Sequence, residues 1–253
     1  MSRIDLIRPE WAAPNTVHAA FTLRSGGVSV GPFESFNLGL HVGDDPLAVE
    51  ENRRRLRASL SLAQRPMWLE QVHGTDVVHL DASTDDAPLR GDAAVARTAR
   101  SVCVIQVADC LPVLFAARSG EAIGAAHAGW RGLANGVLEA TVQAMNVEPS
   151  RLLAWLGPAI GPANFEVGDE VRAAFVCRGE QADAAFKKNP RGRWQCDLYA
   201  LARLRLAALG LSSVTGGKWC THADSQRFFS HRRDGRCGRM AALIWLATPA
   251  DTA

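Results

Sequence analysis

The sequence predicts an α+β fold in which helices and strands are intermixed. Two observations favour it: stretches of helical and of strand-like periodicity follow one another, and they do so without the regular alternation that builds a parallel sheet. The glycine fingerprint of a dinucleotide-binding fold is also missing. The chain has 253 residues, 47% hydrophobic and 21% charged, which allows one large buried core. No internal repeat, low-complexity tract or linker interrupts it, so we expect residues 1–253 to form a single domain.

The first half of the chain alternates short apolar runs with turn-rich segments. The apolar runs predict strands at 17–23, 67–72, 76–80 and 101–107. Asp44 or Asp45 is placed to cap a helix that begins at Pro46 and ends near Leu60, and its arginines are expected on a solvated face. Between these elements we expect a glycine-rich loop, a loop with a short strand, and a polar loop, at 24–32, 33–40 and 83–90. No Lys-Ser/Thr pair follows the glycines, so this is not a nucleotide-binding P-loop.

The second half is read in the same way. Strands are predicted at 113–117, 122–126, 151–156, 219–221 and 240–246. Helices are predicted at 133–145, from about 169 to 175, and at 197–209, where Gly210 stops the last of them. The charged and polar stretch at 178–193 is expected to be a mobile loop or lid.

Charge and composition exclude several classes of protein. The formal net charge of +2 gives no electrostatic basis for binding nucleic acid or a membrane surface. The first residues lack the apolar core of a signal peptide, and no run reaches the ~20 apolar residues of a membrane span. The six cysteines are scattered without close pairs, so we expect reduced thiols in a cytoplasmic protein.

The chemistry-bearing residues gather at predicted strand ends. Asp109 and Cys110 follow the strand at 101–107, and His127 follows the strand at 122–126. The strand at 113–117 and a short turn separate Cys110 from His127. The strands at 113–117 and 122–126, which this turn joins, should be antiparallel neighbours, with the two side chains close together. His73 is a third candidate. One thiol and two imidazoles form either a Cys/His nucleophile pair or three ligands of an open zinc site.

Sequence blocks across the chain, from about residue 20 to 246, carry a resemblance. They include Ala108-Asp-Cys-Leu-Pro-Val113, and the most specific are Gln71-Val-His-Gly74 and Ala126-His-Ala-Gly-Trp-Arg-Gly132 in this order. They resemble the multicopper polyphenol oxidase (laccase-like) domain family, whose members are now described as zinc-dependent purine nucleoside phosphorylases. The resemblance implies a four-layer α/β/β/α sandwich with mixed sheets, related to Cys/His hydrolase-like toxin and deamidase folds. It also implies that the metal is held by His73, Cys110 and His127, with zinc as cofactor and copper less favoured.

Further residues are candidates for catalysis or substrate binding. Asp109 is a candidate to move a proton or orient a histidine, although on a regular strand its side chain would face away from that of Cys110. Guanidinium groups suit phosphate, which makes candidates of Arg24, Arg131, Arg232 and Arg233; the alternative for each is a surface ion pair. Phe228 and Phe229 are available to stack a base. Two amides are candidates for holding substrate or shaping their own loops, Asn37 and Gln71.

The resemblance implies phosphorolysis of adenosine, inosine or 5′-methylthioadenosine, with adenosine deamination as a second activity. A purine nucleoside and phosphate would then be the partners, with no protein partner evident. Three alternatives stay open: a copper-dependent polyphenol oxidase, a Cys/His amide or ester hydrolase acting on a cell-wall precursor or protein, and a metal-stabilised binding module. Seven dispersed histidines argue against the oxidase, since they are too few to build four copper sites.

Overall fold

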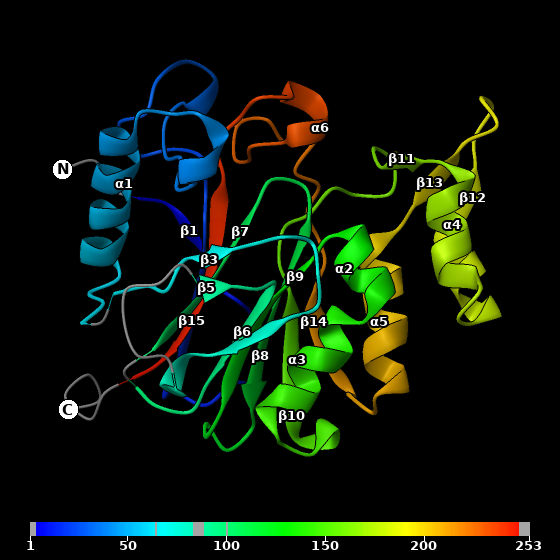
Figure 1. Ribbon diagram of the computed structural model, residues 1–253, viewed down its shortest axis with the longest axis horizontal. Helices are drawn as coiled ribbons and strands as arrows, with labels where there is room; N and C mark the ends of the chain where they lie inside the picture. The colour runs from blue at the N-terminus through cyan, green and yellow to red at the C-terminus, as the bar shows by residue number, and fades with distance from the viewer. Residues whose placement is uncertain (1–3, 64, 83–88, 100, 248–253) are drawn as a thin grey trace.

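The computed structural model describes residues 4–63, 65–82, 89–99 and 101–247. Two β-sheets pack face to face, and helices cover their outer faces (Figure 1). Of the helices in this part of the chain, none combines the length and apolar character of a membrane span.

The first sheet has four strands in the order β1-β2-β15-β7, and all neighbours are antiparallel. Their bounds are Leu6–Ile7, Val17–Thr22, Met240–Leu246 and Val102–Val107. The second sheet has six strands in the order β14-β10-β8-β9-β6-β4. Their bounds are Ser213–Gly216, Leu152–Leu156, Leu111–Ala117, Ile123–Ala128, Ala93–Ala96 and Val77–His79. Its two outer pairs are parallel and the rest antiparallel, so the prediction of mixed sheets is confirmed, as is the antiparallel pairing of β8 with β9.

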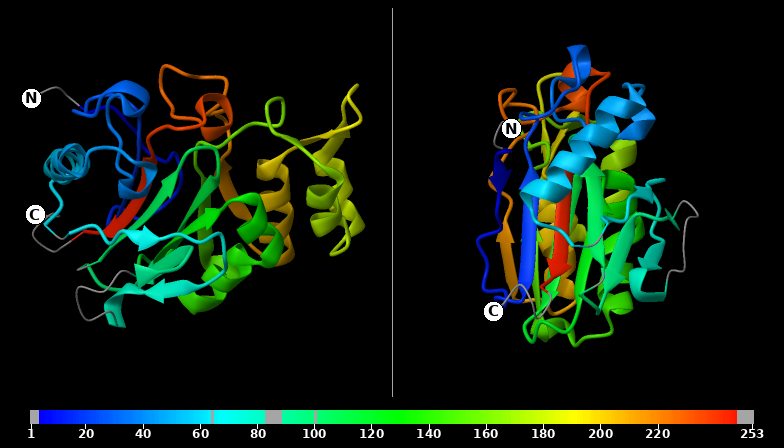
Figure 2. Two further views of the ribbon diagram at one scale, coloured as in Figure 1. Left: turned by 45° about the horizontal axis from the view of Figure 1, so that its top comes forward. Right: turned by 90° about the vertical axis from the view of Figure 1, so that its left-hand side faces the viewer.

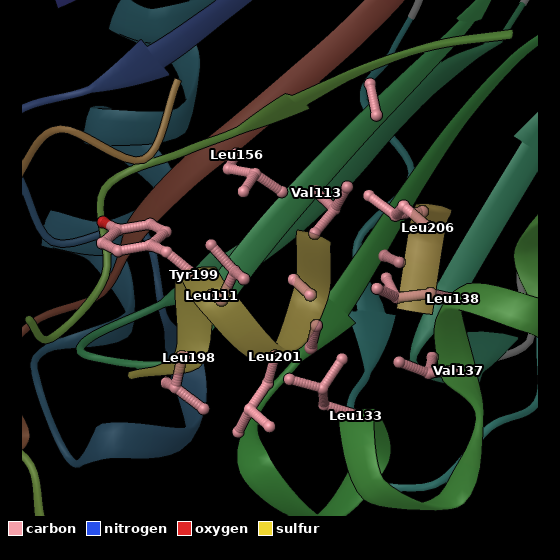
Figure 3. Packing of buried hydrophobic residues seen from close by; sticks show 14 of the residues in the cluster. Leu111, Val113, Leu133, Val137, Leu138, Leu156, Leu198, Tyr199, Leu201 and Leu206 are labelled. Carbon is pink, nitrogen blue, oxygen red and sulfur yellow. The ribbon is translucent and has the colours of Figure 1, made fainter. Parts of the chain in front are cut away.

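Side chains alternate across each strand, which gives each sheet an inner and an outer face. In β8, Leu114 and Ala116 point between the sheets, whereas Leu111, Val113 and Phe115 point toward helices. Helices α2, α3 and α5 cover that outer face, at Trp130–Asn135, Val137–Met145 and Leu198–Ala208. Figure 3 shows leucines of these helices converging on the strands. Each fully buried leucine contributes about 2 kcal/mol to folding through removal of apolar surface from water.

Helix α1, at Pro46–Ser59, covers the outer face of the first sheet. Leu56 of the helix packs with Val104 and Leu243 of the strands. Asp45 caps the helix by accepting a hydrogen bond from the Leu47 N–H, as the sequence predicts. The order helix, sheet, sheet, helix confirms the four-layer α/β/β/α sandwich, while the relation to Cys/His hydrolase-like folds stays a prediction.

Two smaller sheets and two helices complete the described chain. Strands β11, β13 and β12 form a three-stranded sheet beside α4, at Glu166–Val167, Trp194–Cys196, Phe186–Lys188 and Asp169–Val176. The left view of Figure 2 shows this unit on the far side of the molecule from α1. Strands β3 and β5 pair in parallel and α6 is a single turn, at Leu69–Glu70, Leu89–Arg90 and His231–Asp234.

The helix expected at 133–145 is two helices. Gly136 separates α2 from α3 and has a φ of 106°, a left-handed conformation that an α-helix cannot continue through. The sequence pattern was continuous across this glycine because both helices bury their apolar faces against the same sheet. Helix α5 agrees with its prediction, since Asp197 caps it and Gly210 follows it with a φ of 90°.

Three other expectations are wrong. The strand predicted at 219–221 lies upstream as β14, because the chain turns at Gly216 and Gly217, and Cys220 makes only an isolated bridge to Ala159. No strand forms in 33–40, whose ends join short 3₁₀ helices at Gly31–Phe33 and Leu40–Val42. The expected loop at 178–193 contains a 3₁₀ helix and β12, since buried Phe186 packs on Phe175. The polar loop predicted at 83–90 falls largely on 83–88, outside the described residues.

Two glycines with the same backbone angle give a matched stability test. Gly192 and Gly216 both have a φ of 76°, but a Cβ at Gly192 meets nothing within 4 Å, whereas one at Gly216 would lie 2.3 Å from the Leu156 carbonyl oxygen. We expect Gly192→Ala to cost about 1 kcal/mol from its left-handed backbone alone. Gly216→Ala should cost more, because strand β14 must also move. Urea denaturation measures both; equal losses would show that this contact does not constrain the sheet.

Candidate metal centre

His73, Cys110 and His127 lie together where the two sheets end. Their ligand atoms are all within 4.8 Å of one another, and Cys110 Sγ is 4.0 Å from His73 Nε2. The centroids of the two imidazole rings are 4.8 Å apart, with an interplanar angle of 72°. His127 is buried and Cys110 half-buried, whereas His73 is exposed, so the group is open to solvent on one side. The structure therefore brings together the three residues that the sequence singled out.

Three different segments deliver these side chains. Cys110 lies where the chain passes from β7 in the first sheet to β8 in the second. His127 is on β9, opposite Pro112 of β8. His73 is in the loop between β3 and β4, in a left-handed conformation with a φ of 62°. The group is thus built at a junction of both sheets and one loop.

Gly129 keeps the space between two of these residues open. A Cβ at this position would lie 2.9 Å from Cys110 Sγ and 3.3 Å from His73 Cδ2. Any side chain there would push the thiol and the imidazole out of place. The glycine that follows the His127 strand is therefore required by close approach rather than by turn geometry alone.

Asp92 is a site residue that the sequence reasoning missed. It is fully buried just before β6, and its Oδ1 accepts a hydrogen bond from His127 Nδ1 at 2.8 Å. The same carboxylate accepts the backbone N–H groups of Val72, His73 and Gly74 at 3.1, 2.9 and 2.7 Å. A carboxylate at the start of an otherwise apolar run was the available signal, because a buried charge needs partners.

The electrostatics of the group favour a thiolate facing an imidazolium in the metal-free protein. Burial opposes ionisation of Cys110, but the charge and hydrogen bonding of His127 and His73 outweigh it and lower the thiol pKa to about 6. Burial likewise opposes protonation of His127, but Cys110 and Asp92 outweigh it and raise its pKa to about 9. For Asp92, burial is outweighed by the hydrogen bonds from His127 and Gly74, so the carboxyl pKa is lowered.

The three donors fit a zinc ion. Ligand atoms at 2.0–2.3 Å from a tetrahedral ion lie about 3.5 Å apart, so separations of no more than 4.8 Å close onto an ion with small side-chain movements. Two imidazoles and a thiolate suit zinc or copper and do not suit magnesium or calcium. The Asp92 bond to Nδ1 leaves Nε2 of His127 for the metal, the usual arrangement of a carboxylate behind a metal-binding histidine. A zinc ion held by these three residues would keep a fourth position for water or substrate.

Comparison with known proteins places the chain in a family. Residues 18–247 match the family described as multi-copper polyphenol oxidoreductase laccase. The chain belongs to this family. A purine nucleoside phosphorylase of Pseudomonas aeruginosa is 55% identical over 242 residues, which cover 95% of this chain and 98% of that protein. The purine nucleoside phosphorylase YfiH of Escherichia coli is 51% identical over 241 residues, covering 95% and 98%.

Solved structures of similar proteins share the fold. A Neisseria meningitidis protein superposes with a TM-score of 0.91 at 46% identity, covering 96% of this chain and 99% of that one. YlmD of Geobacillus stearothermophilus superposes with a TM-score of 0.84 at 35% identity, covering 92% and 93%. The family fold therefore extends over almost the whole chain.

Asp109 faces away from the metal residues of this family member. Its carboxylate accepts hydrogen bonds from Thr221 Oγ1 at 2.6 Å, Ser230 Oγ at 3.0 Å and the Arg232 N–H at 2.6 Å. A φ of 87° turns its backbone, so the alternation of a regular strand does not apply at this residue. These contacts anchor the C-terminal segment beside Cys110, and a direct role of Asp109 in catalysis stays a prediction.

Two of the candidate arginines are bound to backbone carbonyls. Arg24 donates to the carbonyl oxygens of Glu34 and Ser225 and lies over the Phe229 ring. Arg233 donates to three carbonyl oxygens, of residues 221, 222 and 228, and pairs with Asp234. Both guanidinium groups therefore shape loops around the site.

The other two arginines keep more of their donors toward solvent. Arg232 donates one hydrogen bond, to the Glu166 carbonyl oxygen, and lies over the Phe165 ring. Arg131 is exposed on the first turn of α2 and lies over the ring of Trp130, four residues after His127. Of the four arginines, Arg131 is therefore the one nearest in sequence to His127.

Both candidate amides are satisfied within the protein. Asn37 is buried and bonds to the backbone of Gly39 and Arg239 and to Asp44. Gln71 pairs with both backbone groups of Gln106 at 2.9 and 2.8 Å, which ties the His73 loop to the edge of β7. Of the two roles the sequence allowed Gln71, the structure shows the one that holds this loop; substrate contact for either amide stays a prediction.

Phe228 and Phe229 are fully buried, so the expectation that they stack a base is wrong. They belong to the core between the sheets, where Phe228 meets Phe21 at a centroid distance of 6.2 Å. The adjoining arginines made the segment look like a surface. Aromatic rings here contribute packing to the loop that carries Ser230 and Arg232.

Two arginines that the sequence reasoning also missed, Arg239 and Arg53, place positive charge around His41. Burial and the positive charges of Arg239, Arg53 and His127 lower the pKa of His41. The expectation of a solvated face is wrong for Arg53. Its guanidinium donates to the Leu38 carbonyl oxygen and stacks on the Trp68 ring. Positive charge near His127 therefore comes from α1 and from the segment before β15 as well as from α2.

Loss of one ligand should remove the metal and leave the fold intact. We expect Cys110→Ala to reduce bound zinc from about one per chain to a small fraction, because two imidazoles alone hold zinc weakly. The core clusters surround the strands and do not depend on the metal, so the circular dichroism spectrum should be unchanged. Elemental analysis measures the metal, with Cys177→Ala at an exposed cysteine as control. Full zinc in the Cys110 variant would remove this residue from the site.

Alkylation should report the ionisation of Cys110. In metal-free protein the thiolate forms as pH rises through about 6, so the rate with iodoacetamide should reach half its maximum near that pH, below the ordinary thiol value of about 8.5. Added zinc should slow the reaction, because the sulfur lone pair is then engaged. Peptide mass spectrometry resolves Cys110 from the other cysteines. An equal rate with and without zinc would contradict the metal assignment.

Proposed function

We propose that this family member is a zinc-dependent purine nucleoside phosphorylase. One observation carries the proposal: an open His-Cys-His group lies in a chain 55% identical, over 95% of its length, to a protein named purine nucleoside phosphorylase. The substrates would be phosphate and adenosine, inosine or 5′-methylthioadenosine. The products would be the free purine base and the ribose 1-phosphate.

The reaction asks for a site that holds an anion against a sugar. A phosphate oxygen forms a bond to C1′ while the bond from C1′ to the purine nitrogen breaks, and the base leaves with that electron pair and takes up a proton. Positive charge develops on the sugar in the transition state. Catalysis therefore depends mainly on holding phosphate against C1′ and on stabilising the charges of the reacting groups. A bound zinc ion would supply positive charge for an oxygen ligand or an activated water.

The chain's own groups suit the anionic substrate. Arg131 lies on the first turn of α2, four residues after His127, and Arg239 and Arg53 add positive charge from other segments. Arg232 is held through its backbone N–H by Asp109, and its guanidinium donates one hydrogen bond to protein, to the Glu166 carbonyl oxygen. We assign phosphate to this cationic surround and the nucleoside to the open side marked by exposed His73.

Adenosine deamination is the second activity within this proposal. It requires water activated near the purine C6 atom, where an amino group leaves as ammonia. The open fourth position would serve either reaction. Which one dominates depends on whether the ribose or the base lies next to the metal group.

A second candidate function is an amide or ester hydrolase, and one observation favours it. Cys110, His127 and Asp92 form the order nucleophile, base and orienting carboxylate, with a thiol pKa of about 6 and a 2.8 Å bond from His127 to Asp92. His73 argues for the metal instead, because a nucleophile–base pair needs no second imidazole within 4.8 Å. A copper oxidase is disfavoured, since the described residues offer one such group of three.

Release of base should require phosphate. We expect adenine from adenosine, and hypoxanthine from inosine, only when phosphate is present, with ribose 1-phosphate formed in equal amount. Chromatography of the products with and without phosphate measures this. Equal release in phosphate-free buffer would indicate a hydrolase, and inosine from adenosine would indicate deamination.

Arg131 should act on phosphate specifically. We expect Arg131→Ala to raise the KM for phosphate by about 10-fold or more, as for loss of a charged hydrogen bond, with a smaller change in the KM for nucleoside. Arg118→Ala is the matched control, because Arg118 is exposed at the opposite end of β8 from Cys110. An unchanged phosphate KM in the Arg131 variant would exclude the residue from that role.

A further inference from the structure

Asp92 is shared by the two segments that supply the histidines. Its Oδ1 accepts both the Nδ1–H of His127 and the backbone N–H of His73, at 2.8 and 2.9 Å. Its Oδ2 accepts the backbone N–H groups of Val72 and Gly74, at 3.1 and 2.7 Å. Four hydrogen bonds therefore converge on one carboxylate that has no exposed surface.

The His73 loop needs this acceptor. Three consecutive N–H groups point at one carboxylate, and the central residue has a left-handed φ of 62°, which is unfavourable for a residue with a side chain. Gln71 fixes the start of the loop to the backbone of Gln106, on the other sheet. Asp92 contacts the loop at His73 itself, through the backbone N–H.

The His127 ring needs the same acceptor. His127 is almost fully buried on β9, and Asp92 is its hydrogen-bond partner at Nδ1. With the proton on Nδ1, the lone pair is on Nε2 and faces the group of three. Without the carboxylate, the ring could present either nitrogen.

We infer that Asp92 is a positioning residue that couples the two histidine ligands. One carboxylate sets the tautomer of His127 and holds the backbone of His73, so both imidazoles meet Cys110 at the same time. The inference rests on the proposed function only through the metal, and it deepens that proposal by naming the residue that preorganises the site. Two ligands fixed by one group bind metal cooperatively, because the ordering of one preserves the ordering of the other.

Zinc affinity tests this directly. Asp92→Asn keeps the shape of the side chain but places an NH₂ group against N–H donors, so no orientation of the amide accepts all four hydrogen bonds. We expect a 10–100-fold weaker zinc affinity for Asp92→Asn and a larger loss for Asp92→Ala, measured by competition with a chromophoric chelator. Asp81→Asn is the matched control, since the Asp81 carboxylate also holds a loop, through Thr98 Oγ1 at 2.7 Å, outside the metal group. Wild-type affinity in Asp92→Asn would overturn the inference.

The coupling itself is tested in backgrounds that lack one histidine. Asp92→Asn should weaken zinc binding further in His73→Ala, through His127, and also in His127→Ala, through His73. A purely local role would abolish the effect in one of these two backgrounds, which would refute the coupling. Cobalt-substituted protein adds a spectroscopic readout, because the visible absorption of cobalt reports the geometry of the Cys110 and histidine ligands. A lower melting temperature with unchanged affinity and spectrum would mean a structural role only.

A measurement on the unmodified protein covers the case in which the variants do not fold. In ¹⁵N-labelled, zinc-loaded protein, we expect a protonated Nδ1 and an unprotonated Nε2 at His127, assigned by comparison with His127→Ala. The reverse tautomer would overturn the inference. All of these readouts are made without nucleoside. If zinc affinity depends on Asp92 and the wild-type protein nevertheless releases no base, only the proposed function is refuted.

Discussion

The site depends on the corner where the chain crosses from one sheet to the other. Strand β7 ends in the first sheet and β8 begins in the second, so the residues between them must lie at the end of the sandwich. Asp109 makes this corner with a left-handed backbone, and its carboxylate is held by three donors from the C-terminal segment. Cys110 follows at once, and the corner therefore fixes where the thiol points. A regular strand at this place would have continued β7 in the first sheet, with no junction between the sheets.

Two buried carboxylates each hold a different segment of the chain near that thiol. Asp109 binds the segment that carries Thr221 and Ser230, and Asp92 binds the loop and strand that carry the two histidines. Burying a carboxylate is costly unless every oxygen has partners, and both meet this condition. The structure thus uses charge in its interior to position loops that have few apolar contacts of their own. Rigid strands position one side of the site, and hydrogen bonds to the two buried carboxylates fix the loops on the other side.

The same geometry explains why two kinds of chemistry compete for this family. A thiolate beside an imidazolium, backed by a carboxylate, is the arrangement of a cysteine hydrolase. The second imidazole, brought in by a loop with a strained backbone, has no use in that chemistry and makes the group one that could hold a metal ion. A family description that names several coppers fits this chain less well, because the described residues offer one group of three that could hold a metal ion.

Periodicity and motifs determined much of this protein from the sequence alone. They identified the strands of the two large sheets except β1, β6 and β14, the capped helices α1 and α5, and the three metal candidates, because these depend on local patterns and on residue chemistry. Tertiary structure alone decided the rest. The break at Gly136, the burial of Phe228 and Phe229 and the capture of Arg233 by carbonyl groups follow from packing between distant segments. Asp92 is the plainest case: its partners lie about 20 and 35 residues away along the chain, so no local pattern could show that one carboxylate serves both histidines.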